Sequence, residues 1–457
     1  MQILVTIALV VIGVLLFEMI IFFHEFGHFI TAKLSGIKVN EFALGMGPKI
    51  FSFKKGETRY SLRLFPIGGF CAMEGEDEES PEPRAFNNAK VWKRMIVVIA
   101  GATMNIILGI IFSFIMVIPQ DAFSSTTIAQ FDPRSYSANC GLQVGDTITK
   151  VNGYNIYNSK DLSFSFVGVN CEDVDGKSLS VYKQDCANAL TTAYGNIVKE
   201  QNPDDDTLLK YYDIVTKDCV KINGAADKQE ALSILNASVD ELYKAAGIAD
   251  YELPVISEKD TRQRYVADLT VIRDGEEVEL EDVQFFTYYK DQEDKEADKP
   301  SVSIDFYVEP IEKNFTSVIS QGFSETYSVG RMVWQSLVWI VQGKFGFKDL
   351  SGPVGVVSAV TQVASQGLEV NFGSAVFNIL NVMTLITINL GIFNMLPFPA
   401  LDGGRFLFLL IEWIFRKPIP RKIEGYVNSA GFIILMIFMI VVTFKDVWQL
   451  FTGQITM

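Results

Sequence analysis

The chain has 457 residues, of which 49% are hydrophobic and only 20% are charged, and this composition is too apolar for a soluble protein of that length. The formal net charge is -15, with 39 Lys and Arg against 54 Asp and Glu, so the chain offers no basic field for a nucleic-acid partner. Residues 120–320 hold about 37 of the 54 acidic side chains. This distribution predicts a membrane protein that carries one acidic soluble domain.

Four apolar stretches predict transmembrane helices, each of which needs about 20 residues to cross the hydrocarbon core. They run from Ile3 to Phe23, Met95 to Ile118, Val376 to Phe398 and Ala430 to Phe444. We assign the spans to residues 1–35, 94–119, 376–402 and 426–448. Lys and Arg are concentrated between the first and second spans and between the third and fourth, so both of these segments should be cytoplasmic.

The first span ends in the chain's only two histidines, His24 and His28, with Glu25 directly after the first. Histidines four residues apart lie on one face of a helix, so both imidazoles can bind a single zinc ion. Glu25 is then placed to accept a proton from water at that ion. The alternative is a pair of interfacial histidines without a metal, but ionisable residues at membrane depth are costly unless they have a function.

Residues 36–93 form the first cytoplasmic segment. Polar and apolar residues alternate from Lys49 to Phe65 on both sides of Lys55-Gly56, which predicts a β-hairpin within residues 45–70. An exposed strand edge there could pair with an unwound substrate, because a helical substrate hides its peptide bonds until it is extended. The alternative is an ordinary cytoplasmic hairpin with no part in binding.

The acidic domain covers residues 120–315 and lies outside the cell if the two basic segments are cytoplasmic. Residues 140–153 resemble the Gly-Leu turn, strand and Asn-Gly turn of PDZ domains, and residues 267–280 read as a matching pair of strands around Asp274-Gly275. The residues between them exceed what a PDZ core needs. Helical periodicity at Leu208–Val215 and Gln229–Ala246 predicts a mostly helical insert at about residues 171–262.

Four of the five cysteines belong to the acidic domain, where disulfides are permitted if the domain is outside the cell. They are Cys140, Cys171, Cys186 and Cys219. Two bridges are possible, and so is the alternative that these cysteines are small buried apolar residues. No CxxC spacing occurs, so structural zinc bound through thiolates is not expected.

Two shorter apolar stretches flank the third span. In residues 316–375, apolar residues recur at helical spacing from Val329 to Val341, which predicts an amphipathic helix along the membrane surface. In the cytoplasmic residues 403–425, the stretch from Phe406 to Phe415 is too short to cross the bilayer. The expected number of spans therefore stays at four.

Asp402 is the best candidate for a third zinc ligand. A catalytic zinc usually has three protein ligands, and no third histidine exists. Asp402 follows Pro397 and Pro399, which break the helix, and precedes Gly403-Gly404, which leave the backbone room to turn. The carboxylate can then turn inward from irregular backbone that lines a cavity. The alternative is that Asp402 only caps the helix that contains Phe406 to Phe415.

These motifs occur together in one known family. The HExxH motif, the Gly-Gly-Phe loop at residues 68–70, the Asn-x-x-Pro-x-Pro-x-Leu-Asp-Gly-Gly segment and the PDZ-like insert resemble the site-2 family of intramembrane zinc metalloproteases, in particular its bacterial regulator-of-sigma-factor type. The resemblance implies that Zn2+ is bound by His24, His28 and Asp402, and that Glu25 is the catalytic acid and base. It also implies a membrane re-entrant β-hairpin and a substrate-binding role for Asn394, Gly68, Gly69 and Phe70. Asn105 lies in a similar family segment, although small residues there also suit ordinary helix packing.

We therefore expect a multi-pass zinc endopeptidase of the bacterial plasma membrane that cleaves transmembrane segments of single-span substrates such as anti-sigma factors or signal-peptide remnants. The active site should face the cytoplasm and the PDZ-like domain the outside. Its partners would be the lipid bilayer, the substrate and an upstream site-1 protease. Two alternatives are a membrane-tethered zinc protease acting on soluble peptides and a non-enzymatic membrane scaffold whose PDZ-like domain binds C-termini.

Overall fold

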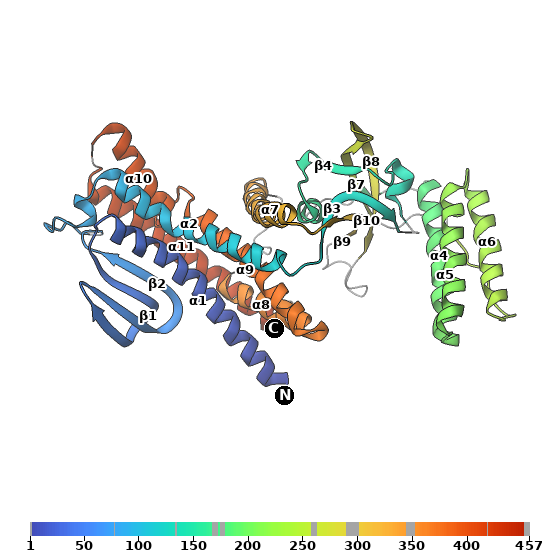
Figure 1. The fold of residues 1–457 in the computed structure, drawn as a ribbon, viewed down its shortest axis with the longest axis horizontal. Helices are drawn as coiled ribbons and strands as arrows, with labels where there is room; N and C mark the ends of the chain where they lie inside the picture. Colours follow the sequence, from blue (N-terminus) through green and yellow to red (C-terminus); the bar gives the residue numbers. More distant parts are fainter. Residues whose placement is uncertain are drawn as a thin grey trace. The chain divides into compact units, whose positions relative to one another are not determined.

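The protein is described by a computed structural model, whose elements are labelled in Figure 1. It describes residues 2–76, 78–132, 135–166, 172–173, 179–256, 263–288, 301–343, 352–417 and 419–451. The chain divides into two compact units, the first made of Met1–Asp121 with Lys313–Met457 and the second of Ala122–Glu312.

Long apolar helices form most of the first unit. They are α1 (Gln2–Leu34), α2 (Val91–Val117), α7 (Phe315–Val341), α8 (Pro353–Val370), α9 (Phe372–Asn394), α10 (Asp402–Phe415) and α11 (Arg421–Phe451). Within the described residues, four segments are long and apolar enough to cross a membrane. They are Val11–Leu34, Val91–Val117, Phe372–Asn394 and Lys422–Gln449. The prediction of four candidate spans is therefore confirmed, with the last helix longer than expected.

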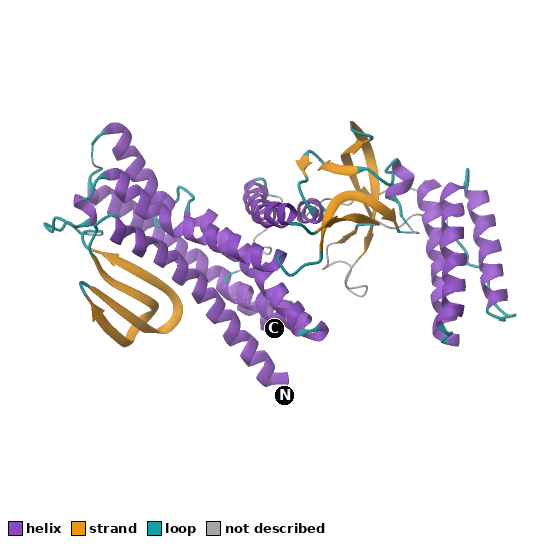
Figure 2. Ribbon diagram, viewed as in Figure 1, coloured by secondary structure: helices purple, strands orange, loops and turns teal. Residues whose placement is uncertain are grey.

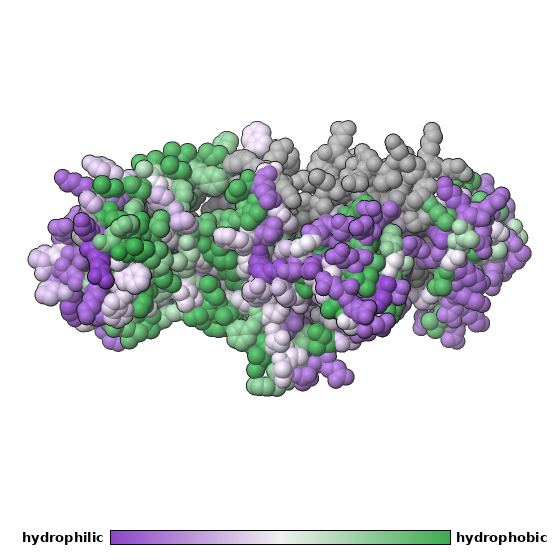
Figure 3. All heavy atoms as spheres, turned by 90° about the horizontal axis from the view of Figure 1, so that it is seen from above, coloured by the Kyte–Doolittle hydropathy of each residue, from purple (hydrophilic) through white to green (hydrophobic). Residues whose placement is uncertain are grey.

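Apolar side chains lie both between these helices and on their outer surface. Ile20, Leu108, Phe112 and Met383 form a buried cluster where α1, α2 and α9 meet. On α11, by contrast, apolar side chains such as Ile437 remain largely exposed. Figure 3 shows hydrophobic side chains over much of the visible face of this unit. Such a surface suits contact with lipid rather than water.

The β-hairpin is longer and more curved than predicted. Strands β1 (Val39–Lys55) and β2 (Thr58–Met73) are antiparallel and join around Gly56, as the Lys-Gly turn predicted. Residues 41–44 of β1 pair with residues 69–72 of β2 and also with residues 59–62, so the hairpin folds back on itself, as Figure 2 shows. Glycines with positive φ at positions 45, 47 and 68 allow the bend.

The second unit contains an antiparallel sheet in the order β10-β3-β4-β7-β8-β9. These strands are β3 (Ala122–Phe131), β4 (Thr147–Val151), β7 (Gln263–Arg273), β8 (Glu276–Tyr288), β9 (Ser301–Ser303) and β10 (Phe306–Glu312), and shorter elements are β5 (Tyr154–Asn155), β6 (Glu172–Asp173) and α3 (Ser159–Ser165). Strand β4 leads into the turn at Asn152-Gly153, and β7 pairs with β8 across Asp274-Gly275, where both turns were expected. The sheet core includes Ile128, Ile148 and Leu269.

The described part of residues 171–262 contains three helices of the second unit. They are α4 (Leu179–Gln201), α5 (Asp205–Gly224) and α6 (Lys228–Ala245), of which α4 had not been singled out from the sequence. Asp204 and Asp227 cap the second and third helices by accepting backbone hydrogen bonds. Cys186 and Cys219 are buried in the apolar core that the three helices share. Cys171 lies outside the described residues, so both alternatives for the four cysteines of the acidic domain stay open.

Candidate metal centre

The two histidines of α1 are oriented by α2. The Nδ1 atom of His28 donates a hydrogen bond of 2.8 Å to the carbonyl oxygen of Val97, and the Nδ1 atom of His24 lies 3.2 Å from the side-chain amide of Asn105. These contacts leave both Nε2 atoms facing each other at 3.3 Å. A hydrogen bond to one ring nitrogen fixes the orientation of a metal-binding histidine and directs the other ring nitrogen to the ion.

Asp402 reaches the histidines from irregular backbone between α9 and α10. Helix α9 ends at Asn394, and Ala400 has a positive φ of 74° with its N–H donating to Oδ1 of Asn428. The N-cap of α10 is Leu401, and Asp402 is the first helical residue. The alternative that Asp402 serves as the N-cap is therefore wrong, and its side chain is directed at the imidazoles instead.

The glycines after Asp402 let α10 begin close to the preceding loop. A Cβ atom added at Gly403 would lie 2.2 Å from the carbonyl oxygen of Leu396, and one added at Gly404 would lie 2.3 Å from that of Phe398. Any side chain at either position would push the loop and the helix apart. The close packing that Gly403 and Gly404 allow thus determines the position of Asp402 at the start of α10.

Three donor atoms converge at this point. Oδ2 of Asp402 lies 3.1 Å from Nε2 of His24 and 3.3 Å from Nε2 of His28. Ligands about 2.0–2.1 Å from a tetrahedral zinc ion are themselves about 3.3 Å apart, which agrees with all three separations. Oδ2 is buried and has no hydrogen-bond partner among the described residues. The arrangement therefore fits a zinc ion.

Glu25 stands beside these three residues. It interacts electrostatically with His24, His28 and Asp402, and its Cγ atom would lie 3.5 Å from a Cβ atom added at Gly69. A carboxylate next to a zinc site can transfer protons during peptide hydrolysis. Glu25 therefore lies beside the candidate metal site.

The four predicted substrate-binding residues differ in how close they lie to the candidate metal site. The Asn394 amide lies 3.4 Å from Nε2 of His24, and Gly69 is packed beside Glu25. The N–H of Gly68 instead donates to Glu18, and the Phe70 ring lies under the guanidinium of Arg63 at 4.8 Å. Asn394 and Gly69 therefore lie next to the candidate metal site. Gly68 and Phe70 instead contact Glu18 and Arg63.

Gly101 of α2 is a residue that sequence reasoning missed as part of the site. A Cβ atom there would lie 2.4 Å from Nε2 of His28 and 2.7 Å from Cε1 of His24. The backbone of α2 therefore covers both imidazoles directly. The small residues around position 101 were visible in the sequence, but they are also typical of ordinary helix packing.

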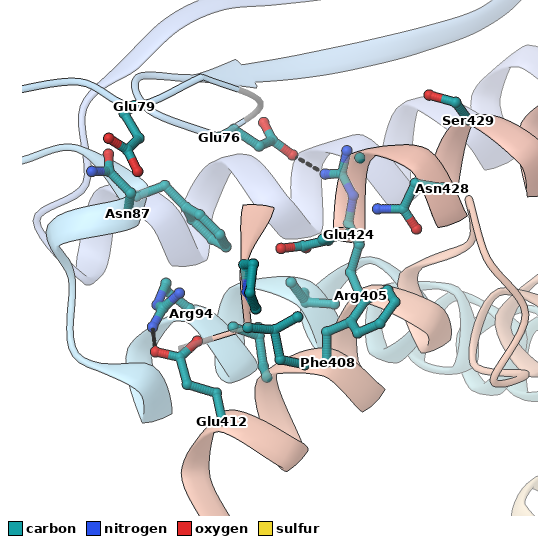
Figure 4. Close-up of a pocket in the computed structure, with 16 residues that line it drawn as sticks. Glu76, Glu79, Asn87, Arg94, Arg405, Phe408, Glu412, Glu424, Asn428 and Ser429 are labelled. Carbon is teal, nitrogen blue, oxygen red and sulfur yellow. Dashed lines mark hydrogen bonds and ion pairs between the residues drawn. The ribbon is translucent and has the colours of Figure 1, made fainter. Parts of the chain in front are cut away.

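A charged cavity of about 690 Å³ opens near the start of α10 (Figure 4). Its lining includes Glu76, Arg94, Arg405, Glu412 and Asn428. Arg94 pairs with Glu412 at 2.6 Å, and Arg405, three residues after Asp402, pairs with Glu76. Polar groups of this kind make the cavity a suitable place for water.

Comparison with known proteins places the chain in a family. The model of peptidase family M50 matches residues 12–438. The chain belongs to peptidase family M50. The zinc metalloprotease RasP of Bacillus licheniformis is 31% identical to it, over 97% of this chain and 99% of that protein. The regulator of sigma-W protease RasP of Bacillus subtilis is 30% identical over 97% and 99%. The zinc metalloprotease RasP of Geobacillus kaustophilus is 28% identical over 96% and 97%.

Membership of the M50 family makes the protein a zinc metalloprotease, as the HExxH motif predicted. The family and the four apolar helices together indicate a membrane protease. The alternative of a non-enzymatic scaffold is therefore wrong.

Proposed function

We propose that this M50 peptidase is an intramembrane endopeptidase in which His24, His28 and Asp402 bind the zinc ion and Glu25 is the catalytic acid and base. One observation carries the proposal. Three donor atoms from α1 and α10 meet at tetrahedral spacing, and α1 is apolar enough to span a membrane. A soluble metalloprotease has no need to place its zinc ligands on such a helix.

Each residue around the site would have a separate part in peptide hydrolysis. A zinc ion held there supplies a Lewis acid that polarises the peptide carbonyl and lowers the pKa of water. Glu25 takes the proton from the attacking water and returns it to the leaving amine. The Asn394 amide, beside His24, is placed to donate a hydrogen bond to the carbonyl oxygen as negative charge develops on it. Gly101 keeps the imidazoles covered by the α2 backbone.

The substrate would be a transmembrane segment of a single-span protein. Its helix must unwind before a peptide bond can reach Glu25, and the extended strand can then pair with an edge of the β-hairpin. Ile50, Phe51 and Phe65 on the hairpin are each more than half exposed, which suits a hairpin that re-enters the membrane. Gly68, Gly69 and Phe70 would form the part of that edge beside the catalytic base.

The distribution of charge and the relatives support a proposal for the cellular setting. Basic residues in the segments 36–93 and 403–425 favour a plasma-membrane protein with these segments and the zinc site toward the cytoplasm. The sheet and helices of residues 120–315 would then form an outer PDZ-like domain that keeps bulky substrates away until a site-1 protease has trimmed them. The name of the B. subtilis relative, regulator of sigma-W protease, supports anti-sigma factors as substrates, and signal-peptide remnants fit the same site.

The test is Glu25→Gln, expressed together with a single-span substrate. We expect cleavage to fall by at least about a hundredfold while the purified protein keeps its zinc, because Gln cannot transfer the proton. Glu79→Gln, at an exposed carboxylate, is the matched control and should cleave normally. Undiminished cleavage by the zinc-loaded Glu25→Gln protein would disprove the assigned base. Equal rates on a soluble peptide and on the membrane-embedded substrate would instead favour the tethered protease for soluble peptides.

A further inference from the structure

Glu18 is a buried acid that the proposed chemistry does not use. It lies near the middle of α1, is only 5% exposed, and precedes Glu25 by seven residues. Seven residues are about two helical turns, so both carboxyl groups lie on the same side of α1. An ionisable residue at this depth of a candidate span is costly unless it has a function.

The Glu18 carboxyl group holds the β-hairpin where its strand pairing is interrupted. The N–H of Gly68 donates to its Oε2 atom at 3.1 Å, and the backbone of Gly45 also interacts with the group. Gly45 and Gly68 have φ values of 79° and 91°, and the register of β1 and β2 shifts beside them. A shift of register leaves backbone N–H groups without a partner in the ladder, and in apolar surroundings these groups need another acceptor. Glu18 provides it.

The residue after Gly68 lies beside the catalytic base. A Cβ atom added at Gly69 would lie 3.5 Å from Cγ of Glu25 and 3.9 Å from Cγ2 of Ile21. Gly69 thus packs against Ile21 and Glu25 of α1, which follow Glu18 by three and seven residues. A single planar peptide bond joins Gly69 to Gly68, so a hydrogen bond that holds the Gly68 N–H limits how far Gly69 can move away from Glu25.

We propose that Glu18 is a positioning residue whose carboxyl group fixes the hairpin at Gly68 and so sets the distance between Glu25 and the strand edge that receives the substrate. This inference rests on the proposed function, which assigns this edge of the β-hairpin to substrate binding. Glu18 touches neither the zinc ligands nor the reacting atoms. Its Oε2 atom accepts the Gly68 hydrogen bond, and its Oε1 atom is buried without a hydrogen-bond partner among the described residues.

The experiment compares Glu18→Ala with Glu18→Gln in full-length protein. Both are reconstituted in vesicles of phosphatidylethanolamine and phosphatidylglycerol with a single-span substrate that the wild type cleaves and Glu25→Gln does not. Glu18→Ala removes the acceptor, and we expect KM to rise about tenfold with zinc content unchanged. Glu18→Gln keeps an amide oxygen for the Gly68 N–H and should restore KM to within about twofold of the wild type. Leu15→Ala, at a 58% exposed position of α1, is the control and should behave as the wild type.

The buried thiol of Cys71 gives a second readout that does not depend on catalysis. Cys71 is a free cysteine of β2, three residues after Gly68, and is 7% exposed. Release of the hairpin in Glu18→Ala should raise its rate of labelling by N-ethylmaleimide about tenfold or more, measured at the Cys71 peptide by mass spectrometry. Glu18→Gln and Glu25→Gln should keep the slow rate of the wild type.

Unchanged KM and unchanged Cys71 labelling in Glu18→Ala would overturn the proposal. So would a loss confined to kcat together with loss of zinc in both Glu18 variants, because that pattern means that Glu18 is needed only for folding. Failure of the proposed function is a different result. In that case Glu25→Gln cleaves the substrate normally, while the effect of Glu18→Ala on Cys71 labelling remains.

Discussion

The metal centre and the charged cavity both involve charged residues of α10, yet they accommodate charge in different ways. At the metal centre, Asp402 brings a buried oxygen without a hydrogen-bond partner to two imidazole nitrogens. At the cavity, Arg405 and Glu412 each pair directly with an opposite charge. The first arrangement is incomplete without a cation, whereas the second is complete in the protein alone. This difference separates the residues that we propose bind zinc from charged residues that pair with each other within the protein.

The two regions also differ in how closely the backbone packs. At the metal centre, an added Cβ atom at Gly101 or Gly403 would come within 2.5 Å of its neighbours. The cavity instead leaves about 690 Å³ of space among its charged side chains. We therefore expect small changes of shape to disturb zinc binding strongly and to be tolerated around the cavity.

The largest effect should come from Asp402→Asn. The amide keeps the size of the side chain but removes the negative charge that balances the ion, so we expect zinc to fall well below one per chain and cleavage to fall by more than about a hundredfold. Metal analysis of the purified protein and a cleavage assay measure both. If Asp402→Asn kept its full zinc content, Asp402 would not be a ligand and the contrast between the two regions would fail.

Gly101→Ala should have the next largest effect. The new methyl group would lie 2.4 Å from Nε2 of His28, so α1 and α2 must separate, and we expect zinc affinity to fall about ten- to a hundredfold. The measurement is zinc retention during titration with a chelator. Gly109→Ala is the matched control, eight residues further along the same helix, because its methyl group would meet the side chain of Ile388 at 2.6 Å. A control that loses zinc equally would show that general helix packing, and not cover of the imidazoles, is responsible.

The three residues proposed to bind zinc could be singled out from the sequence because each is marked locally. His24 and His28 are marked by their spacing, and Asp402 by the proline and glycine residues around it. Val97 and Gly101 were not predicted as parts of the site, since their roles depend on how α2 packs on α1, which no local pattern reveals. The same reason applies to Glu18, whose contact with Gly68 joins residues 50 positions apart.

The fold shows the same division between local and long-range information. Periodicity and length identified the candidate spans, and turn residues identified the strand pair around Asp274-Gly275. The curvature of the β-hairpin was not predicted, because it arises from glycines with positive φ that allow one strand to pair with two parts of the other. Helix α4 was not singled out, because its apolar residues are less confined to one face than those of α5 and α6.

Glu412→Gln, which breaks the more buried ion pair of the cavity, should have a smaller effect than the changes at the metal centre. The side chains of Arg94 and Glu412 are 11% and 18% exposed, so Glu412→Gln leaves the guanidinium without its charged partner, and we expect a loss of about 1–3 kcal/mol in the free energy of unfolding. Thermal unfolding in detergent measures the change, and zinc content should be unaffected. Arg94→Met combined with Glu412→Gln should recover part of the loss, because no unpaired charge then remains. Loss of zinc in either variant would contradict the separation of the two regions.

The smallest effect should come from Glu76→Gln, which breaks the other ion pair of the cavity. Arg405 is 36% exposed, and water in the cavity can solvate its guanidinium once the carboxylate is gone. We expect the free energy of unfolding to change by less than about 1 kcal/mol, and the difference between wild type and variant to shrink further at high salt, because exposed pairs are screened. A larger and salt-independent loss would mean that the pair holds the start of α10 in place. The position of Asp402 would then depend on the cavity as well as on the glycines that follow it.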